Sequence, residues 1–356
     1  MFKIIDRYIV GKFLGTYVFA IILILAITIM FDINQKLDAF LKAPFKETVF
    51  DYFVNFLPYF ANQFSPLFTF IAVIFFTSKL AGNSEITAML STGMSYRRLL
   101  WPYLLSATII AGATYYLSAY VIPPANIKRI EFTNKYVKNR RVDYGTNIQM
   151  QVAPGLIAFI NRYDNTTKTG SKFSLEKFEG KKLVSRLTAQ NIVWDTAYRW
   201  TVKDYLIRSF DGRRESITGG TRLDTIIPFE PRDFLISKHD QETLTTPRLK
   251  EYVKRQQQRG VANIESFDIE LHRRYAMTAA AFILTVIGMS LSSRKIKKGM
   301  GVNLGIGLVL SFSYLLFMTV TQSFAISGMT SPMTAMWIPN IIYGVIAVFL
   351  YFKAAR

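Results

Sequence analysis

The sequence predicts an α-helical membrane protein in which six transmembrane helices flank one large inserted domain of β structure. Hydrophobic residues make up 51% of the 356 residues and aromatic residues 15%, more than an average soluble domain of this size carries. Charged side chains are missing from six long apolar segments and are abundant in one segment of about 150 residues between the third and fourth of these. This pattern predicts two groups of three spans joined through a polar domain.

The six spans are delimited by the positions at which Asp, Glu, Lys, Arg and His disappear, because a bilayer core takes about 20 helical residues with few charges. They cover residues 13–31, 56–78, 100–122, 275–291, 301–324 and 335–352. The sequence SGMTSP, residues 327–332, separates the last two and predicts a tight helical hairpin. The basic N-terminus has no clear small-residue cleavage site, so we expect the first span to be retained.

The distribution of Lys and Arg predicts the orientation. Basic clusters occur in the N-terminus, in the loop after span two, in the loop after span four and in the C-terminal tail, whereas the loop after span one balances three Lys with four acids. Basic residues in short loops favour the cytoplasm. Both termini are therefore expected in the cytoplasm, and the inserted domain on the opposite side.

The inserted domain is expected over residues 123–272, between membrane parts at 1–122 and 273–356. From Pro123 to Arg274 there are 28 Lys and Arg against 18 Asp and Glu, a net charge of about +10. This excess indicates either an anionic partner or simple contact with lipid headgroups. Nucleic acid is a poor alternative for a domain that faces away from the cytoplasm.

Alternation of apolar and polar residues from Lys172 to Ile217 predicts antiparallel hairpins that turn at Gly180, at residues 195–198 and at Gly212. The period changes in TPRLKEYVKRQQQRG, residues 246–260. Thr246 can cap a helix there, with Pro247 in its first turn, a stripe of Leu249, Tyr252 and Val253, and an end at Gly260.

A short helix is predicted at about residues 83–93, in the loop after span two. Asn83 or Ser84 can cap it, Glu85 lies near the positive end of its dipole, and Gly93 ends it. Ser95 can begin the next helix. By itself this element fits an amphipathic helix lying on lipid, with Glu85 acting only as an aid to capping.

Chemistry carried out by this chain itself is not expected. It contains no G-x-x-x-x-G-K-[ST] loop for ATP and no H-E-x-x-H metal site, and it has no cysteine. His239 and His272 are far apart, and His272 is expected to be a residue of the membrane surface. The spans contain no ionisable groups of the kind that couple transport to ions. Energy for any transport should therefore come from another protein.

Four segments resemble the LptF/LptG (YjgP/YjgQ) permease family, the membrane subunits of the ABC exporter for lipopolysaccharide. They are IDRYIVGKF at residues 5–13, SEITAMLSTGMSYRRLL at 84–100, ELHRRYAM at 270–277 and SPMTAMWIPN at 331–340. The second and fourth are the more specific, and the resemblance covers nearly the whole chain. The segment IDRYIVGKF slightly favours a G-type subunit over an F-type subunit.

The resemblance implies that the helix near residues 83–93 couples the spans to a cytoplasmic ATPase dimer (LptB-like). The residues implied in this coupling are Ser84, Glu85, Ile86, Met89, Arg97 and Arg98. No cofactor is expected on this chain, since ATP and Mg²⁺ would bind the ATPase. Further partners implied are a second permease subunit (LptF- or LptG-like), a membrane-anchored LptC-like subunit and a periplasmic LptA-like bridge. The inserted domain resembles the family's periplasmic β-jellyroll. The resemblance also implies that the protein lies in a bacterial inner membrane.

Lipopolysaccharide is the implied cargo, and basic groups near the outer membrane surface are natural partners for its phosphates. The candidates are Lys36, Lys42, Lys128, Arg129, Arg273 and Arg274. Some family members have a lysine at the outer end of span one, where this chain has Phe31 or Asp32. We therefore hypothesise that Lys36 takes over that contact.

Two alternatives come from other classes of protein. A membrane enzyme acting on lipid or glycan headgroups would use the acidic residues after span one, namely Asp32, Asp38, Glu47 and Asp51, which fit a solvated loop better. A scaffold for envelope assembly would need the six spans but no ATPase. The scaffold predicts that Glu85→Lys has no effect.

Overall fold

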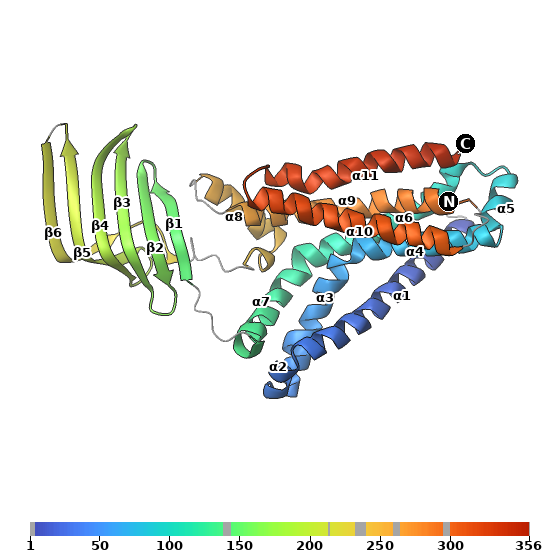
Figure 1. Cartoon of the computed structure of the whole chain (residues 1–356), viewed down its shortest axis with the longest axis horizontal. Helices are drawn as coiled ribbons and strands as arrows, with labels where there is room; N and C mark the ends of the chain where they lie inside the picture. The colour runs from blue at the N-terminus through green and yellow to red at the C-terminus, as the bar shows by residue number, and fades with distance from the viewer. Residues whose placement is uncertain are drawn as a thin grey trace. The chain divides into compact units, whose positions relative to one another are not determined.

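A computed structural model describes residues 4–137, 144–212, 214–231, 240–258, 264–294 and 300–355. The chain divides into two compact units. A helical unit contains residues 1–137, 242–247 and 265–356, and a β unit contains residues 138–241 and 248–264. Figure 1 labels the helices and strands of both units, which are described separately below.

Six helical segments among the described residues are long and apolar enough to cross a membrane, which confirms the predicted number. They are α1 (Ile4–Gln35), α4 (Ser65–Gly82), a run at Tyr96–Val137 that contains α6 (Tyr96–Tyr116) and α7 (Ile122–Phe132), α9 (Glu265–Ser292), α10 (Met300–Ile326) and α11 (Pro332–Ala355). Five of the six extend beyond the apolar range read from the sequence at both ends. Charged and polar residues are tolerated there because their side chains can reach the membrane surface.

The predicted range of the second span, 56–78, is wrong at its start. A separate helix, α3 (Val54–Gln63), ends at Phe64, whose backbone leaves the helical conformation (φ −95°, ψ 1°), and α4 begins at Ser65. Pro66 lies in the first turn of α4 and has no N–H group to continue the preceding helix. Residues 56–78 contain no charged side chain, so the absence of charges could not reveal this break.

The hairpin between the last two spans is confirmed. Helix α10 ends at Ile326 and α11 begins at Pro332. Gly328 has a φ of +74° at the turn, a conformation that favours glycine. The backbone N–H of Met329 donates to Phe324 O at 3.0 Å, so the turn satisfies the last carbonyls of α10.

Helices α4 and α9 form the centre of the helical unit, and glycine permits their close approach. A Cβ atom added at Gly288 of α9 would lie 2.9 Å from Val73 Cγ1 of α4. Side-chain hydrogen bonds add polar links between spans: Asn340 of α11 donates to Ala276 O at 2.8 Å and accepts from Tyr314 of α10 at 2.8 Å. Such interhelical bonds stabilise contacts between helices that lipid would otherwise solvate equally well.

Helix α1 contacts the rest of the unit mainly near its two ends. Its buried residues are Asp6, Ile9, Phe13 and Asp32. Apolar side chains of the central stretch between Val18 and Phe31 are mostly exposed. One residue before this stretch, the Tyr17 hydroxyl makes a polar contact with α4, 2.7 Å from Ser65 Oγ.

Short helices follow α1 and surround a cluster of aromatic rings. These helices are α2 (Leu37–Lys42), a wider π-helical segment at Glu47–Phe53, and α3. Tyr52 and Phe56 are stacked with ring centroids 5.5 Å apart, and Phe132 of α7 lies 5.1 Å from the Tyr52 ring. The cluster fixes α3 against α7.

The β unit contains one antiparallel sheet of six described strands in the order β1-β2-β3-β4-β5-β6. The strands are β1 (Tyr144–Ala153), β2 (Leu156–Asp164), β3 (Thr169–Glu179), β4 (Lys182–Trp194), β5 (Arg199–Asp211) and β6 (Arg214–Ile226). The predicted turns are confirmed: Gly180 and Gly212 adopt φ values of +64° and +62°, and residues 195–198 connect β4 to β5. The inserted domain is thus a predominantly β, jellyroll-like fold.

The core of the sheet centres on Trp200, which is 1% exposed. Its indole Nε1 donates to Phe229 O at 3.0 Å, and the Phe229 ring lies 4.6 Å from the indole. Strand β6, by contrast, is exposed along nearly its whole length. Helix α8 (Thr246–Gln258) begins as predicted and buries Leu249 and Val253, while its predicted end at Gly260 lies outside the described residues.

Candidate coupling helix and basic clusters

The predicted short helix after the second span is present as α5 (Glu85–Ser91). The predicted cap is wrong: Ser84 occupies the N-cap position with a φ of +64°, and its side chain makes no capping hydrogen bond. Capping side chains act from an extended backbone, which Ser84 does not have. Gly93, with a φ of +88°, follows the end of α5 as predicted, and Ser95 Oγ accepts the N–H of Arg98 at 3.3 Å, which caps α6.

The carboxylate of Glu85 lies at the first turn of α5 and is partly exposed. Its Oε2 accepts the Tyr8 hydroxyl of α1 at 3.2 Å, and its Oε1 accepts Asn83 Nδ2 at 3.1 Å. These bonds restrain the side chain without removing its charge. Glu85 therefore remains accessible to a cation from outside the chain.

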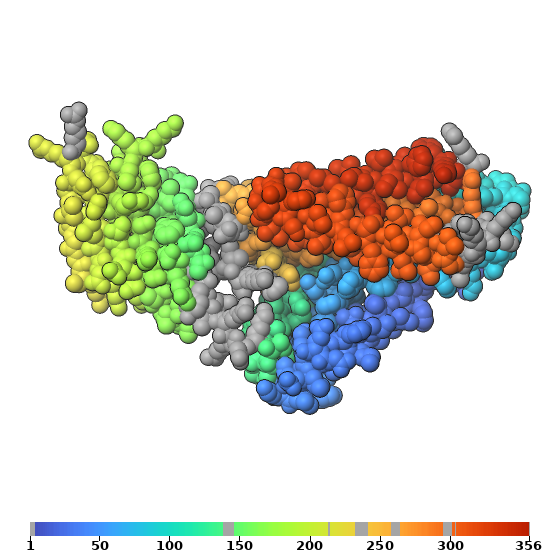
Figure 2. Space-filling view, in the orientation of Figure 1, coloured from blue at the N-terminus to red at the C-terminus, as the bar shows by residue number. Residues whose placement is uncertain are grey.

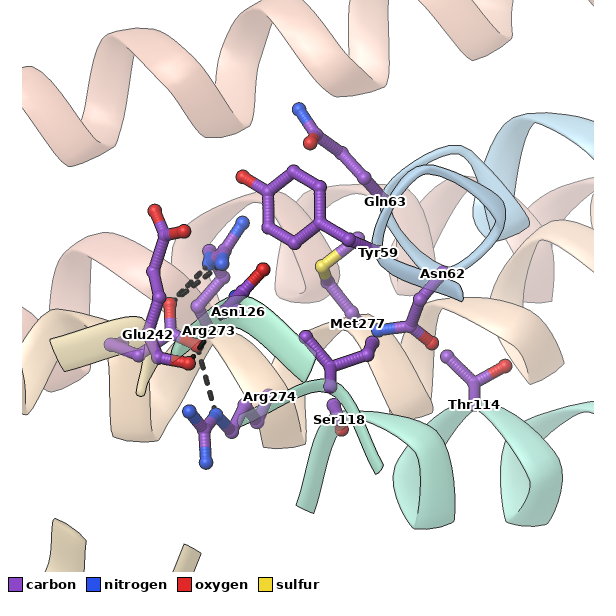
Figure 3. A pocket seen from close by; sticks show the side chains of 12 residues that line it. Tyr59, Asn62, Gln63, Thr114, Ser118, Asn126, Glu242, Arg273, Arg274 and Met277 are labelled. Atoms are coloured by element: carbon purple, nitrogen blue, oxygen red, sulfur yellow. Dashed lines mark hydrogen bonds and ion pairs between the residues drawn. The ribbon is translucent and has the colours of Figure 1, made fainter. Parts of the chain in front are cut away.

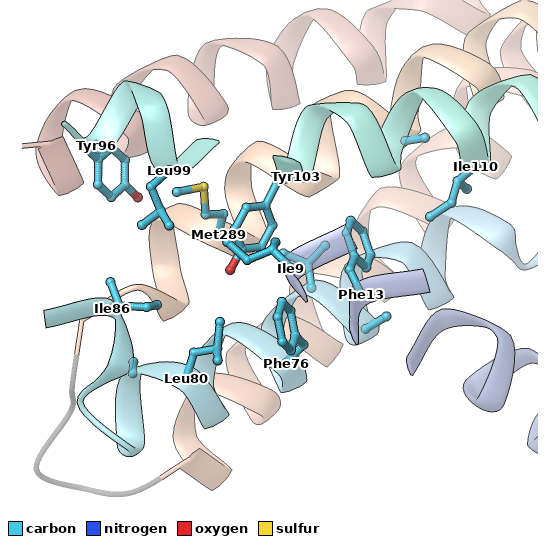
Figure 4. Close-up of a cluster of buried hydrophobic side chains, with 14 of the residues drawn as sticks. Ile9, Phe13, Phe76, Leu80, Ile86, Tyr96, Leu99, Tyr103, Ile110 and Met289 are labelled. Carbon is cyan, nitrogen blue, oxygen red and sulfur yellow. The ribbon is translucent and has the colours of Figure 1, made fainter. Parts of the chain in front are cut away.

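Ile86 fixes α5 to the ends of the spans. It is 1% exposed and belongs to a buried cluster with Leu80, Tyr96 and Leu99, drawn in Figure 4. Met89 packs on the same cluster and is partly buried. The opposite side of α5 is exposed at Thr87, Ala88, Leu90 and Ser91. The helix is thus attached by one face and open on the other.

Arg97 and Arg98 begin α6 and have different surroundings. Arg98 Nη2 donates to Asp6 Oδ2 of α1 at 2.6 Å, and the Asp6 side chain is only 4% exposed. This ion pair joins the start of α1 to the start of α6. Arg97 is exposed and has no ion-pair partner among the residues that the structure describes.

Lys36, the first lysine after α1, is held within the helical unit. Its Nζ donates to Asp32 Oδ1 at 2.5 Å and to the Tyr52 hydroxyl, and it lies 5.0 Å from the Tyr52 ring centroid. Burial raises the pKa of the Tyr52 phenol, and the charge of Asp32 acts in the same direction, so this hydroxyl stays protonated. The side chain of Lys36 is 25% exposed, which leaves it a route to a ligand.

Lys42 and Lys128 lie apart from this pair, and both are exposed. Lys128 lines a polar hollow of about 370 Å³ with Glu47 and Lys135. The hydrogen bonds from Lys135 and then Tyr136 hold the pKa of the Glu47 carboxyl below its usual value. Glu47 therefore stays ionised beside the two lysines.

Arg273 and Arg274 of α9 share one carboxylate, that of Glu270. Arg273 Nη2 lies 2.7 Å from Glu270 Oε2, and Arg274 Nε donates to Glu270 Oε1 at 2.8 Å. Figure 3 labels the two arginines. The Arg274 side chain is 3% exposed and also donates to Leu244 O at 3.0 Å and Thr246 Oγ1 at 2.9 Å. Arg274 thereby fixes the segment before α8 to the start of α9.

Arg129 of α7 belongs to the same polar cluster. It donates to Asn126 Oδ1 at 3.0 Å, pairs with Glu242 at 3.5 Å, and lies over the ring of Tyr59 at 4.4 Å from its centroid. Burial raises the pKa of Tyr59, and the Glu242 carboxylate acts in the same direction. A small cavity of about 20 Å³ lies within this cluster and is lined by Tyr59 and Glu242 among others.

The six basic candidates are thus divided by the structure. Arg129, Arg273 and Arg274 come together around Glu242 and Glu270. Lys36 is paired with Asp32, and the remaining two lysines point to open surface. A phosphate could reach Lys42 or Lys128 with little change. For Lys36 and Arg274 it would have to compete with the buried carboxylates of Asp32 and Glu270.

Sequence reasoning missed the partners of these basic groups. Two of the pairs have a recognisable signal, since Asp32 and Lys36, like Glu270 and Arg274, are four residues apart on a helix. The pair of Asp6 and Arg98 spans 92 residues and has no local signal.

Two of the four acidic residues considered for a membrane enzyme lie in separate ion pairs. Asp32 pairs with Lys36 at one position and Glu47 with Lys135 at another. Within the described part of the chain no group of three or more His, Cys, Asp or Glu side chains could hold a metal ion. His272 lies beside Asp268, with 3.4 Å between Nε2 and Oδ1.

Six apolar helices and a β-sheet unit inserted among them define a multi-pass membrane protein with a large extramembrane domain. Residues 7–353 match the family described as lipopolysaccharide export system permease LptF/LptG. The chain belongs to this family and is a multi-pass inner-membrane protein with a permease role in lipopolysaccharide export. A search of curated proteins found no matching relative.

Proposed function

We propose that this chain is the permease subunit of an ABC transporter that extracts lipopolysaccharide from the inner membrane, and that α5 receives the motion of a separate cytoplasmic ATPase dimer (LptB-like). The observation that carries the proposal is the arrangement of α5: Ile86 is buried against the ends of the spans, while Glu85 stays accessible. A helix attached in this way transmits a push on its open face directly to α1, α4 and α6. ATP and Mg²⁺ bind the ATPase, and this chain needs no cofactor of its own.

The remaining parts of the proposal concern the cargo and its release. Lys36, Lys42 and Lys128 are accessible basic groups for the phosphates of lipid A. Arg129, Arg273 and Arg274, which are paired with Glu242 or Glu270, are further candidates. The β unit receives the lipid on the periplasmic side, with both chain termini in the cytoplasm. A second permease subunit, a membrane-anchored LptC-like subunit and an LptA-like bridge complete the pathway. Of the two subunit types, G is favoured.

The first experiment is purification of the tagged chain from its native membrane, with identification of the proteins that accompany it. We expect a cytoplasmic ATPase and a second permease of similar size. Glu85→Lys should reduce ATPase recovery or activity at least tenfold, because reversing a charge in a docking contact removes an attraction and adds a repulsion of about 1 kcal/mol or more each. The permease partner should remain bound.

Two control variants separate the possible causes. Tyr8→Phe removes only the internal hydrogen bond to Glu85, so it should leave ATPase recovery unchanged. Glu179→Lys reverses an exposed charge in the β unit and should also have no effect. If the wild-type chain purifies with no ATPase, the exporter proposal is wrong and the scaffold becomes the better description. If Tyr8→Phe acts like Glu85→Lys, Glu85 works by packing within the chain.

The contact of Lys36 with phosphate has its own test. Lys36→Ala should weaken export and lipid-stimulated ATP hydrolysis, because it removes the accessible ammonium group at the end of α1. Unchanged values for both would remove Lys36 from the lipid site and would leave the role of Glu85 untouched.

A further inference from the structure

An apolar groove lies between α6, α9 and α11 of the helical unit and has a volume of about 480 Å³. Its walls include Leu100 of α6, Phe282 and Val286 of α9, and Gly344, Val348 and Tyr351 of α11. Figure 2 shows α10 and α11, in orange and red, side by side on one face of this unit. The volume falls within the range of about 300–1,000 Å³ that is typical of ligand sites.

Glycine opens the groove at α11. A Cβ atom added at Gly344 would meet no atom within 4 Å, in contrast to Gly288, where the space is filled. Val348, one turn further along α11, is 56% exposed. The missing side chain at position 344 therefore leaves space that no other part of the described chain occupies.

Polar contacts fix the three helices at the end of the groove where α6 begins and α11 ends. The Tyr96 hydroxyl of α6 lies 3.1 Å from Ser293 Oγ, just after α9, and the Tyr96 and Tyr351 rings are 5.6 Å apart. Arg294 Nη2 donates to Lys353 O of α11 at 3.2 Å, which also satisfies a carbonyl at a helix end. The spacing of the helices is thus set without help from an occupant.

A positive charge lies at this same end. Arg97 is exposed and precedes Leu100 by three residues, which places the two on one face of α6. Its neighbour Arg98 is engaged by Asp6, but Arg97 has no ion-pair partner among the described residues. An apolar groove with an arginine about one helical turn before its wall residue Leu100 matches a molecule with an apolar chain and an anionic head.

We propose that this groove binds one acyl chain of an anionic phospholipid, whose phosphate contacts Arg97. All three helices are membrane spans, so phospholipid is the medium that surrounds the groove. A transmembrane helix of a partner is a poorer fit, because it needs a surface for a body about 10–12 Å wide. Close helix pairing also favours small residues four apart, whereas Gly344 is flanked at that spacing by Asn340 and Val348. The site does not depend on the transport cycle.

The test measures phospholipid retained by the purified complex. Wild-type and variant complexes are washed in detergent, and glycerophospholipid per chain is determined by mass spectrometry. Gly344→Leu fills the groove. Gly112→Leu is the matched control, because Gly112 is likewise a glycine of a span with no atom within 4 Å of an added Cβ. We expect wild type and Gly112→Leu to retain about one phospholipid more than Gly344→Leu, with equal melting temperatures for the two variants.

The headgroup is tested with Arg97→Gln. Complexes are exchanged into phosphatidylglycerol or phosphatidylcholine, and the phospholipid retained per chain is compared. We expect wild type to prefer the anionic lipid about fivefold, since one basic residue near a membrane contributes about 1 kcal/mol. Arg97→Gln should remove the preference and keep the retained acyl chain. Equal selectivity in the two proteins would show that Arg97 does not recognise the net negative charge of the headgroup.

A third measurement identifies the occupant directly. The chain has no cysteine, so a photoreactive benzophenone can be attached at Val348→Cys alone. Labelling of a glycerophospholipid supports the proposal. Labelling of a protein chain or of lipopolysaccharide overturns it, as does equal lipid retention by Gly344→Leu and Gly112→Leu.

Discussion

Removal of the buried guanidinium of Arg274 should be among the most destabilising single changes in the helical unit. In Arg274→Met, three acceptors lose a charged donor: Glu270 Oε1, Leu244 O and Thr246 Oγ1, at 2.8, 3.0 and 2.9 Å. Hydrogen bonds to charged groups contribute about 1.5–3 kcal/mol each, but Arg273 still pairs with Glu270 and water can enter the small cavity. We therefore expect a loss of about 3–5 kcal/mol, the range for breaking a buried ion pair.

The assay is thermal or chemical unfolding of the purified complex, with Lys135→Met as the matched control in the same unit. Lys135 pairs with Glu47 at 3.0 Å, but its side chain is 60% exposed, so solvent screens the pair and its loss should change the stability little. The double variant Glu270→Leu/Arg274→Met should lose less than the sum of the single changes, because the two residues interact directly. A cost for Arg274→Met no larger than that of Lys135→Met would refute the stabilising role of this cluster.

Two further predictions concern packing and pH. Gly288→Ala should destabilise the helical unit by about 1–3 kcal/mol, because its Cβ would lie 2.9 Å from Val73 Cγ1. Gly112→Ala is the control and should be neutral or slightly stabilising, since an added Cβ meets no atom within 4 Å. Unfolding measurements on both variants check this. The lowered pKa of Glu47 means that its ion pair stabilises the native state above the carboxyl's unfolded pKa and that this stabilisation is lost as pH falls through the lower native value. Melting curves between about pH 7 and pH 3 should show a smaller acid-side decline for Glu47→Gln than for wild type; identical curves would count against the contact.

The spans and hairpins could be predicted because each has a local chemical cause. A lack of charge over about 20 residues places a helix in the bilayer, and glycine at Gly180, Gly212 and Gly328 permits the positive φ that a tight turn needs. The sheet follows from alternation alone. The break at Phe64 could not be found by counting charges, although Pro66 is a sign of it.

The site was less predictable because its contacts join distant parts of the chain. Glu85 could be placed on a short helix, but its bond to Tyr8 depends on how α1 and α5 pack. Ser84 has a residue type that usually caps a helix, yet its left-handed backbone prevents this. Likewise, the charge of Arg129 is visible in the sequence, while its engagement by Glu242, 113 residues away, is not.

The attachment of α1 near its two ends has a consequence for the response of the protein to its membrane. Its 32 residues span about 48 Å, well beyond a hydrocarbon layer of about 30 Å. The ion pairs at Asp6 and Asp32, near the two ends, are thus placed at headgroup depth, and the exposed apolar stretch crosses the acyl region between them. A thinner or thicker bilayer would then change the mismatch between this helix and the hydrocarbon layer. Because both ends of α1 are held by ion pairs, the helix would respond by changing its tilt, which therefore depends on lipid composition.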